Sequence, residues 1–181
     1  MSTKTDKDYI EELEQEVAML TAERDGVLRR WEGKAMNIQF TVDAIPVAQP
    51  RQRIASKGRD GAPLPFPRAY TPTTHPVNAF KACVKAAASE LFDSPTNNPV
   101  ECFLIFVLPR PRAKIWKTKP MPRLPDDRKR NDCDNLAKSI LDALTGIAWN
   151  DDGQIYRLFI EKWIAGGDEK PHVEITISDG T

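Results

Sequence analysis

A nearly unbroken apolar run, from Val100 to Leu108, most restricts what this chain can fold into. Only Glu101 interrupts it. The run is much shorter than the roughly 20 residues that a helix needs to cross a membrane. A strand that is covered on both faces has this composition, because neither face meets water. The sequence therefore predicts a strand in the middle of a sheet, with other parts of the chain packed over it.

Weaker periodicities on either side of this run predict the other strands and two helices. The first helix is predicted to be capped by Thr73 or Thr74, to hold Pro76 in its first turn and to end near Phe92. This pattern is typical of an α+β domain with a single mixed β-sheet packed with helices. The other predicted elements are strands over residues 38–42, 155–164 and 172–177, and a helix over residues 133–146.

Two basic stretches separate these elements, although the formal net charge of the chain is zero. Residues 46–72 and 109–131 are rich in proline and lack periodicity, so both are predicted to be long loops. Loops with this charge can bind phosphates. The basic residues are Arg51, Arg53, Lys57, Arg59 and Arg68 in the first, and Arg110, Arg112, Lys114, Lys117, Lys119, Arg123, Arg128, Lys129 and Arg130 in the second.

Residues 8–32 are predicted to form an amphipathic, coiled-coil-like helix ahead of the sheet domain. The predicted division is an N-terminal helical extension over 1–33 and a domain over 36–178. The helix either packs on its own domain or pairs with a second copy. Its apolar stripe consists of Ile10, Leu13, Val17, Leu20, Val27 and Trp31.

The three cysteines, Cys83, Cys102 and Cys133, fit neither a disulfide framework nor a zinc site. We expect reduced thiols, with Cys83 and Cys102 in the core. The sequence has no apolar run of membrane-spanning length, and its polar start does not resemble a secretory signal. We therefore expect a cytoplasmic protein.

Two pairs of acidic residues flank the second predicted helix. Asp132 and Asp134 lie at its start, and Asp151 and Asp152 lie in a turn just before the next strand. At 100° per residue, Asp134 and Lys138 fall opposite the apolar face. A helix start and a strand start can meet at one end of a sheet, which would bring three or four carboxylates within reach of one or two hard cations such as Mg²⁺. The apolar face consists of Leu136, Ile140, Ala143, Leu144 and Ile147.

Each of these features also has an ordinary structural explanation. Asp132 can be a helix cap, Asp134 and Lys138 can form an exposed ion pair, and Asp-Asp-Gly is common in turns. Their joint occurrence after a basic loop leaves two interpretations open, namely these ordinary explanations and a metal site for phosphodiester hydrolysis.

One segment of the chain reads Arg128-Lys129-Arg130-Asn131-Asp132-Cys133-Asp134-Asn135-Leu136-Ala137-Lys138. It is followed by Asp142-Ala143-Leu144-Thr145 and by Trp149-Asn150-Asp151-Asp152-Gly153-Gln154. Together, and in this order, these stretches resemble the RusA family of Holliday junction resolvases. The stretch from Pro50 to Pro72 is also similar to RusA-like phage and prophage proteins. The resemblance implies catalytic roles for Asp132, Asp134, Lys138 and Asp152, with metal held by Asp132, Asp134, Asp151 and Asp152. It also implies a homodimer that cuts four-way junctions symmetrically with Mg²⁺, in DNA recombination and repair.

The resulting hypothesis is a Mg²⁺-dependent endodeoxyribonuclease for Holliday junctions, with Mn²⁺ as a possible substitute. The alternatives are a related nuclease for flaps, forks or other branched DNA, and a non-catalytic junction-binding protein. Which of Asp151 and Asp152 binds the metal directly is left open. The predicted DNA contacts, which position phosphates without reading sequence, are Arg51, Arg53, Lys117, Lys119, Arg128, Lys129 and Arg130.

Overall fold

The computed structural model describes residues 36–57, 62–118, 120–128 and 131–180, together with Glu11, Gln15, Ala18, Met19 and Ala22. These five N-terminal residues are helical. The rest of the predicted helix at 8–32 lies outside the described residues, so this helix and the division of the chain near residue 33 stay predictions. Among the described helices, none has the length and apolar character to span a bilayer.

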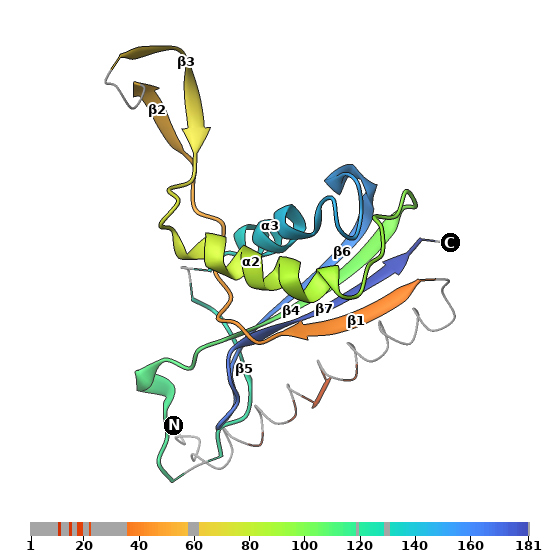
Figure 1. Cartoon of the computed structure of the whole chain (residues 1–181). Helices are drawn as coiled ribbons and strands as arrows, with labels where there is room; N and C mark the ends of the chain where they lie inside the picture. The colour runs from red at the N-terminus through yellow and green to blue at the C-terminus, as the bar shows by residue number, and fades with distance from the viewer. Residues whose placement is uncertain are drawn as a thin grey trace.

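A five-stranded mixed sheet forms the body of the molecule, in the order β1-β7-β4-β6-β5 (Figure 1). The β4–β6 pair is parallel and the other pairs are antiparallel, which confirms the predicted mixed sheet. The strands are β1 (Asn37–Val42), β4 (Val100–Leu108), β5 (Leu124–Pro125), β6 (Ile155–Ile164) and β7 (His172–Asp179).

Strand β4 lies at the centre of this sheet and is buried along its whole length, as its composition predicts. Its alternate side chains enter two clusters. Leu104 and Phe106 join the main core with both helices, whereas Phe103 and Ile105 join a smaller cluster with Trp163. Because β4 buries apolar surface on both of its faces, the main core and the smaller cluster are packed against the same strand.

Helices α2 (Pro76–Ser89) and α3 (Cys133–Leu144) cover one face of the sheet side by side (Figure 1). The buried residues of α3 include Leu136, Ile140 and Leu144, so the predicted apolar face is the one that packs on the sheet. Helix α2 is capped by His75, whose Nδ1 accepts a hydrogen bond from the Val77 amide at 3.2 Å. The predicted cap at Thr73 or Thr74 was therefore wrong, because the helix starts at the proline itself.

Residues 46–72 are not a structureless loop. They contain a second, two-stranded sheet, β2 (Arg53–Lys57) paired antiparallel with β3 (Pro63–Tyr70). This hairpin projects away from the helical layer (Figure 1). The sequence conceals it because three prolines in β3 remove strand donors and break the apolar alternation that predicts a strand.

Two cysteine predictions have different outcomes. Cys102 is fully buried in β4, and desolvation raises the pKa of its thiol to about 12, so it stays protonated. Cys83 is exposed on α2, which makes its predicted core position wrong. At 100° per residue it lies about 100° from the centre of the buried face formed by Phe80, Val84 and Ala88, at the flank of the helix.

Candidate active site

The first acidic pair stands at the entrance of α3. Asp132 occupies the N-cap position but makes no side-chain capping bond, and Asp134 lies in the first turn. Both are exposed, as is Lys138 one turn further on. Within the described part of the chain neither carboxylate is committed to a hydrogen bond or an ion pair. Two acidic side chains left open at the positive end of a helix dipole are available to a cation or to water.

The second acidic pair lies in a hydrogen-bonded turn between α3 and β6. Asp152 Oδ1 accepts from the indole Nε1 of Trp149 at 3.0 Å and from the Thr145 hydroxyl. Trp149 is fully buried, so it holds this carboxylate in a fixed orientation. Asp151 Oδ1 accepts from the Gly153 amide at 2.8 Å. A Cβ at position 153 would lie 2.8 Å from that oxygen, so a side chain there would displace the Asp151 carboxylate.

Gln154 fastens this turn to the rest of the sheet. Its Oε1 accepts from the amides of Asn150 and Asp151 at 2.8 and 2.9 Å. Its Nε2 donates to the carbonyls of Thr96 and Asn98 at 2.8 and 3.0 Å, just before β4 begins. The Asp-Asp-Gly-Gln sequence is therefore a rigid turn at the end of the sheet where β4 and β6 start.

The two acidic pairs lie at opposite ends of α3. The helix has 12 residues, which at 1.5 Å per residue is about 18 Å. Asp152 is bonded beside its C-terminal end, while Asn131, next to Asp132, is bonded to Lys162 near the far end of β6. Among the described residues no group of three or more His, Cys, Asp or Glu could hold a metal ion. The structure does not bring the four carboxylates together within one chain.

Of the predicted phosphate contacts, Arg128 is engaged in the fold. Its Nε and Nη2 donate to the two oxygens of Asp126 at 2.6 and 2.8 Å. Burial acts to raise the pKa of Asp126, but the hydrogen bonds and charge of Arg128, with the charge of Lys162, outweigh it and lower the pKa. Lys162 Nζ also donates to the carbonyls of Arg128 and Asn131, at 3.2 and 2.9 Å.

The structure describes only some of the other predicted DNA contacts. Arg51 and Lys117 are exposed, and Arg53 begins β2. Lys119, Lys129 and Arg130 lie outside the described residues. Sequence reasoning missed Lys162, whose charge within a strand gives no signal of its two loop contacts.

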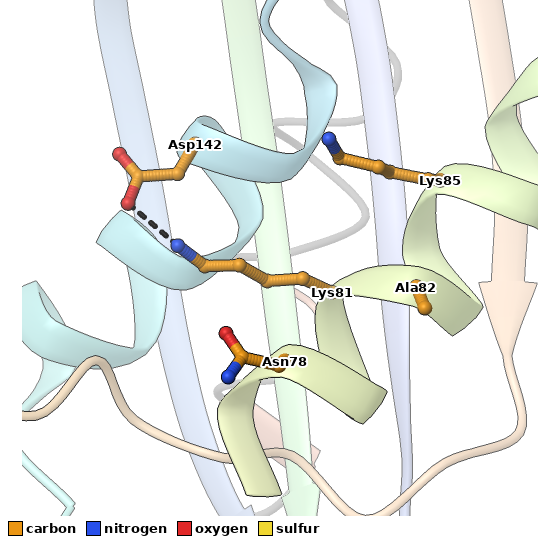
Figure 2. A pocket seen from close by; sticks show the side chains of 5 residues that line it. All are labelled: Asn78, Lys81, Ala82, Lys85 and Asp142. Carbon is orange, nitrogen blue, oxygen red and sulfur yellow. Dashed lines mark hydrogen bonds and ion pairs between the residues drawn. The ribbon is translucent and has the colours of Figure 1, made fainter. Parts of the chain in front are cut away.

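A shallow cleft of about 390 Å³ lies between α2 and α3. Figure 2 shows Lys81 reaching from α2 to Asp142 on α3, with an Nζ–Oδ2 distance of 2.7 Å, and Lys85 one turn along. Asp142 falls on the same side of α3 as Asp134 and Lys138, but it is paired across the helices. This half-buried ion pair fixes α3, and with it Asp134, against α2.

A comparison with protein-family models gives a match to the endodeoxyribonuclease RusA family over residues 43–178. The match covers most of the chain. The chain belongs to the RusA family. A search of curated proteins found no match.

Membership confirms the predicted resemblance and its α+β fold. RusA proteins are endodeoxyribonucleases of the Holliday junction resolvase type, so this chain is a hydrolase that acts on branched DNA. Nucleases of this family generally depend on a divalent metal ion. The residues at the start of α3 fit such an ion in part, because Asp132 and Asp134 offer hard, uncommitted oxygen ligands and leave positions for water and phosphate.

Proposed function

We propose that this RusA family member resolves Holliday junctions by symmetric, Mg²⁺-dependent hydrolysis during DNA recombination and repair. The observation that carries the proposal is the exposed Asp132–Asp134 pair at the start of α3, which has no hydrogen-bond or ion-pair partner among the described residues. We place this activity in the cytoplasm of a bacterial or phage-infected cell. Mn²⁺ has similar ligand preferences and is expected to substitute.

Asp132 and Asp134 would hold the metal ion, and Lys138 would contact the scissile phosphate. A bound divalent ion activates water and neutralises charge on the attacked phosphate. Lys138 projects from the same side of α3 as Asp134, one turn away. A cation at this position can stabilise the negative charge that develops on the phosphate oxygens.

Asp152 would serve the same site from the second copy of the chain. Its Oδ1 is fixed by Trp149 and Thr145, while its Oδ2 accepts no hydrogen bond within the described residues, which leaves one oxygen for a ligand. About 18 Å of helix keeps it from Asp134 of its own chain. Asp151 Oδ1 is bonded within its turn. The resemblance, which gives Asp152 a catalytic role, favours Asp152 as the direct ligand.

Strand β6 offers a way to bring the two chains together. Among the described residues, β6 pairs on the side away from β4 with β5 alone, at Trp163 and Ile164, and the earlier residues Tyr156 and Leu158 of β6 are exposed. Antiparallel pairing of two β6 strands about a two-fold axis would place the start of each opposite the end of the other. Asp152 of the partner subunit would then approach Lys162 and the start of α3.

The basic segments would position the junction by its phosphates. Arg51 and Lys117 are exposed and are proposed to touch DNA directly, with Arg53, Lys119, Lys129 and Arg130. Arg128, which is paired with Asp126, would act mainly by shaping the segment that leads to Asp132, and would contact phosphate with its remaining donors.

The first experiment incubates the full chain with a synthetic four-way junction, a matched duplex and a flap, with and without Mg²⁺. Paired incisions in the junction only, and only with Mg²⁺, are expected. Preferential cutting of the flap would instead identify a nuclease for other branched DNA. Junction binding without any cutting would identify a non-catalytic binding protein.

A mixing experiment tests the shared site. Asp134→Asn and Asp152→Asn chains are each expected to be inactive alone. When the two are unfolded together and refolded, a mixed dimer would contain one intact site, formed by the unchanged Asp152 of one chain and the unchanged Asp134 of the other. Such a dimer should nick a single strand of the junction. If each site came from one chain, every mixed dimer would stay inactive.

A further inference from the structure

The β2–β3 hairpin exposes large apolar side chains that no other described part of the chain covers. The exposed fractions are 75% for Ile54, 79% for Phe66 and 45% for Tyr70. The two strands pair with each other and with no other described strand. A two-stranded hairpin is at best marginally stable in water. We call residues 51–70, which include this hairpin, the arm. Its exposed apolar residues are therefore expected to contact a partner.

The charge of the arm identifies that partner as a polyanion. Asp60 is the only acid between residues 51 and 70, which carry five basic residues. The same arm on a second copy would be repelled, because like charges would face each other. A nucleic acid supplies both the negative charge and apolar base faces. The basic residues are Arg51, Arg53, Lys57, Arg59 and Arg68.

The base of the arm is attached beside the candidate active site. The Gln49 amide donates to the carbonyl of Asn135 at 2.8 Å, one residue from Asp134. From there the hairpin projects outward (Figure 1). Strand β3 has 8 residues, which gives the arm a reach of about 26 Å. DNA that lies at the start of α3 is thus within reach of the arm.

Phe66 is presented by a stiff and irregular part of β3. Arg68 pairs with Ala55, but Pro63 pairs with Lys57, so the register shifts across the stretch that contains Phe66. Such a bulge redirects side chains out of the regular pattern. Pro65 and Pro67 flank Phe66 and restrict the backbone on both sides. The backbone that carries the exposed ring therefore loses little further conformational freedom when the ring contacts a partner.

We propose that Phe66, assisted by Tyr70, stacks on bases exposed at the branch point and so makes the enzyme prefer junctions to duplex DNA. The inference rests on the proposed action on branched DNA. Bases inside a duplex are already stacked, whereas those at a branch point have free faces. Stacking on an aromatic ring tolerates any base, which suits recognition of DNA shape over sequence. Apolar side chains that insert between bases also unstack them.

The test measures binding by the full chain in EDTA, so that no cleavage occurs. The probes are a four-way junction and a matched duplex, each with 2-aminopurine at the position that flanks the branch point in the junction. Phe66→Ala is expected to weaken junction binding roughly 5- to 100-fold, with less than a twofold change for duplex, and to remove the rise in 2-aminopurine fluorescence. Phe66→Trp should keep the junction affinity and the rise in 2-aminopurine fluorescence of the unmodified chain, and the fluorescence of the new indole should be quenched on binding.

Two variants separate stacking from general apolar contact. Phe66→Leu keeps apolar bulk without a flat ring and should behave like Phe66→Ala. Ile54→Ala removes a similarly exposed aliphatic side chain from the same arm and should lower junction affinity much less than Phe66→Ala does. A Phe66→Leu protein with normal junction affinity, or an equal loss of affinity in Ile54→Ala, would overturn the proposal. So would an equal loss for junction and duplex in Phe66→Ala. If the unmodified chain did not bind the junction at all, the proposed function itself would be refuted.

Discussion

At the scale of single residues, Asp152 shows how the fold aims a carboxylate. The buried indole of Trp149 and the hydroxyl of Thr145 both donate to Oδ1, so the side chain cannot rotate without breaking two hydrogen bonds. Asp134, in contrast, stands exposed and has no partner among the described residues. In the proposed metal site the two residues would therefore behave differently: Asp152 would be held in place before the ion binds, and Asp134 would be ordered by the ion.

Replacing Trp149 with Phe should keep most of the packing and remove one donor to Asp152. We expect a stability loss of about 1–3 kcal/mol, and a higher Mg²⁺ concentration for half-maximal cleavage, because the carboxylate is no longer held. Cleavage measured across a Mg²⁺ titration checks this. Activity that recovers at high Mg²⁺ would support a positioning role, whereas an unchanged Mg²⁺ requirement would contradict it.

Asp134→Asn should leave the fold and junction binding intact while cleavage falls by more than about 100-fold, because the carboxamide loses the charge that holds the ion. Gel-shift and cleavage assays on one preparation check this. Asp168→Asn changes another exposed aspartate, in the turn before β7, and is the matched control. Near-normal cutting by Asp134→Asn would remove Asp134 from the metal site.

At the scale of elements, charged contacts hold the segment between β4 and α3 in addition to the pairing of β5 with β6 and the burial of Leu124. Arg128 bridges back to Asp126, and Lys162 of β6 reaches two carbonyls of the same segment. Asp126 is only 7% exposed, so its partners are needed to keep it ionised in the fold. These contacts set the place at which α3, and hence Asp132, begins.

This arrangement predicts a pH-dependent stability. Because the folded pKa of Asp126 is lowered, its contribution is present above the unfolded pKa near 3.8 and is lost as the pH falls through the folded value. Asp126→Asn should therefore be less stable than the unmodified chain at pH 7, by about 1–3 kcal/mol, and the difference should shrink below pH 4. Urea unfolding at pH 7 and pH 3 provides the comparison. If the two proteins differed by the same free energy of unfolding at both pH values, this prediction would be contradicted.

The elements that the sequence predicted are those with a clear apolar pattern, either a period or, for β4, an unbroken run. Strands β1, β4, β6 and β7 and both helices of the sheet domain lie close to their predicted positions, because burial alone sets their patterns. The β2–β3 hairpin was missed for the opposite reason. Its side chains are largely exposed and its prolines break the alternation, so no burial pattern is present in the sequence.

At the scale of the whole molecule, the acidic pairs could be found from the sequence but their separation could not. Asp132 and Asp152 are 20 positions apart in the chain, and the prediction that they meet assumed that a helix start and a strand start share one end of the sheet. The intervening helix runs back along β6, which places them at opposite ends. Tertiary direction of this kind leaves no local trace in the sequence.

Removal of residues 1–33 tests the predicted division of the chain. The family match begins at residue 43, and β1 begins at Asn37, so the sheet domain should fold without the extension. We expect junction cleavage to persist with a moderate loss, measured together with sedimentation of both forms. A folded, dimeric but wholly inactive product would place the extension in the DNA site. A monomer that nicks one strand would identify it as the dimerisation element.

The length of α3 has a consequence for how the cutting rate depends on protein concentration. If neither copy holds a complete set of ligands, an isolated chain can bind DNA and leave it uncut, and hydrolysis begins only after two chains meet. Below the dimer dissociation constant the cutting rate should then rise with the square of protein concentration, and at high dilution it should fall much faster than binding does. Dilution itself would thus protect DNA from a nuclease that is present but not yet assembled.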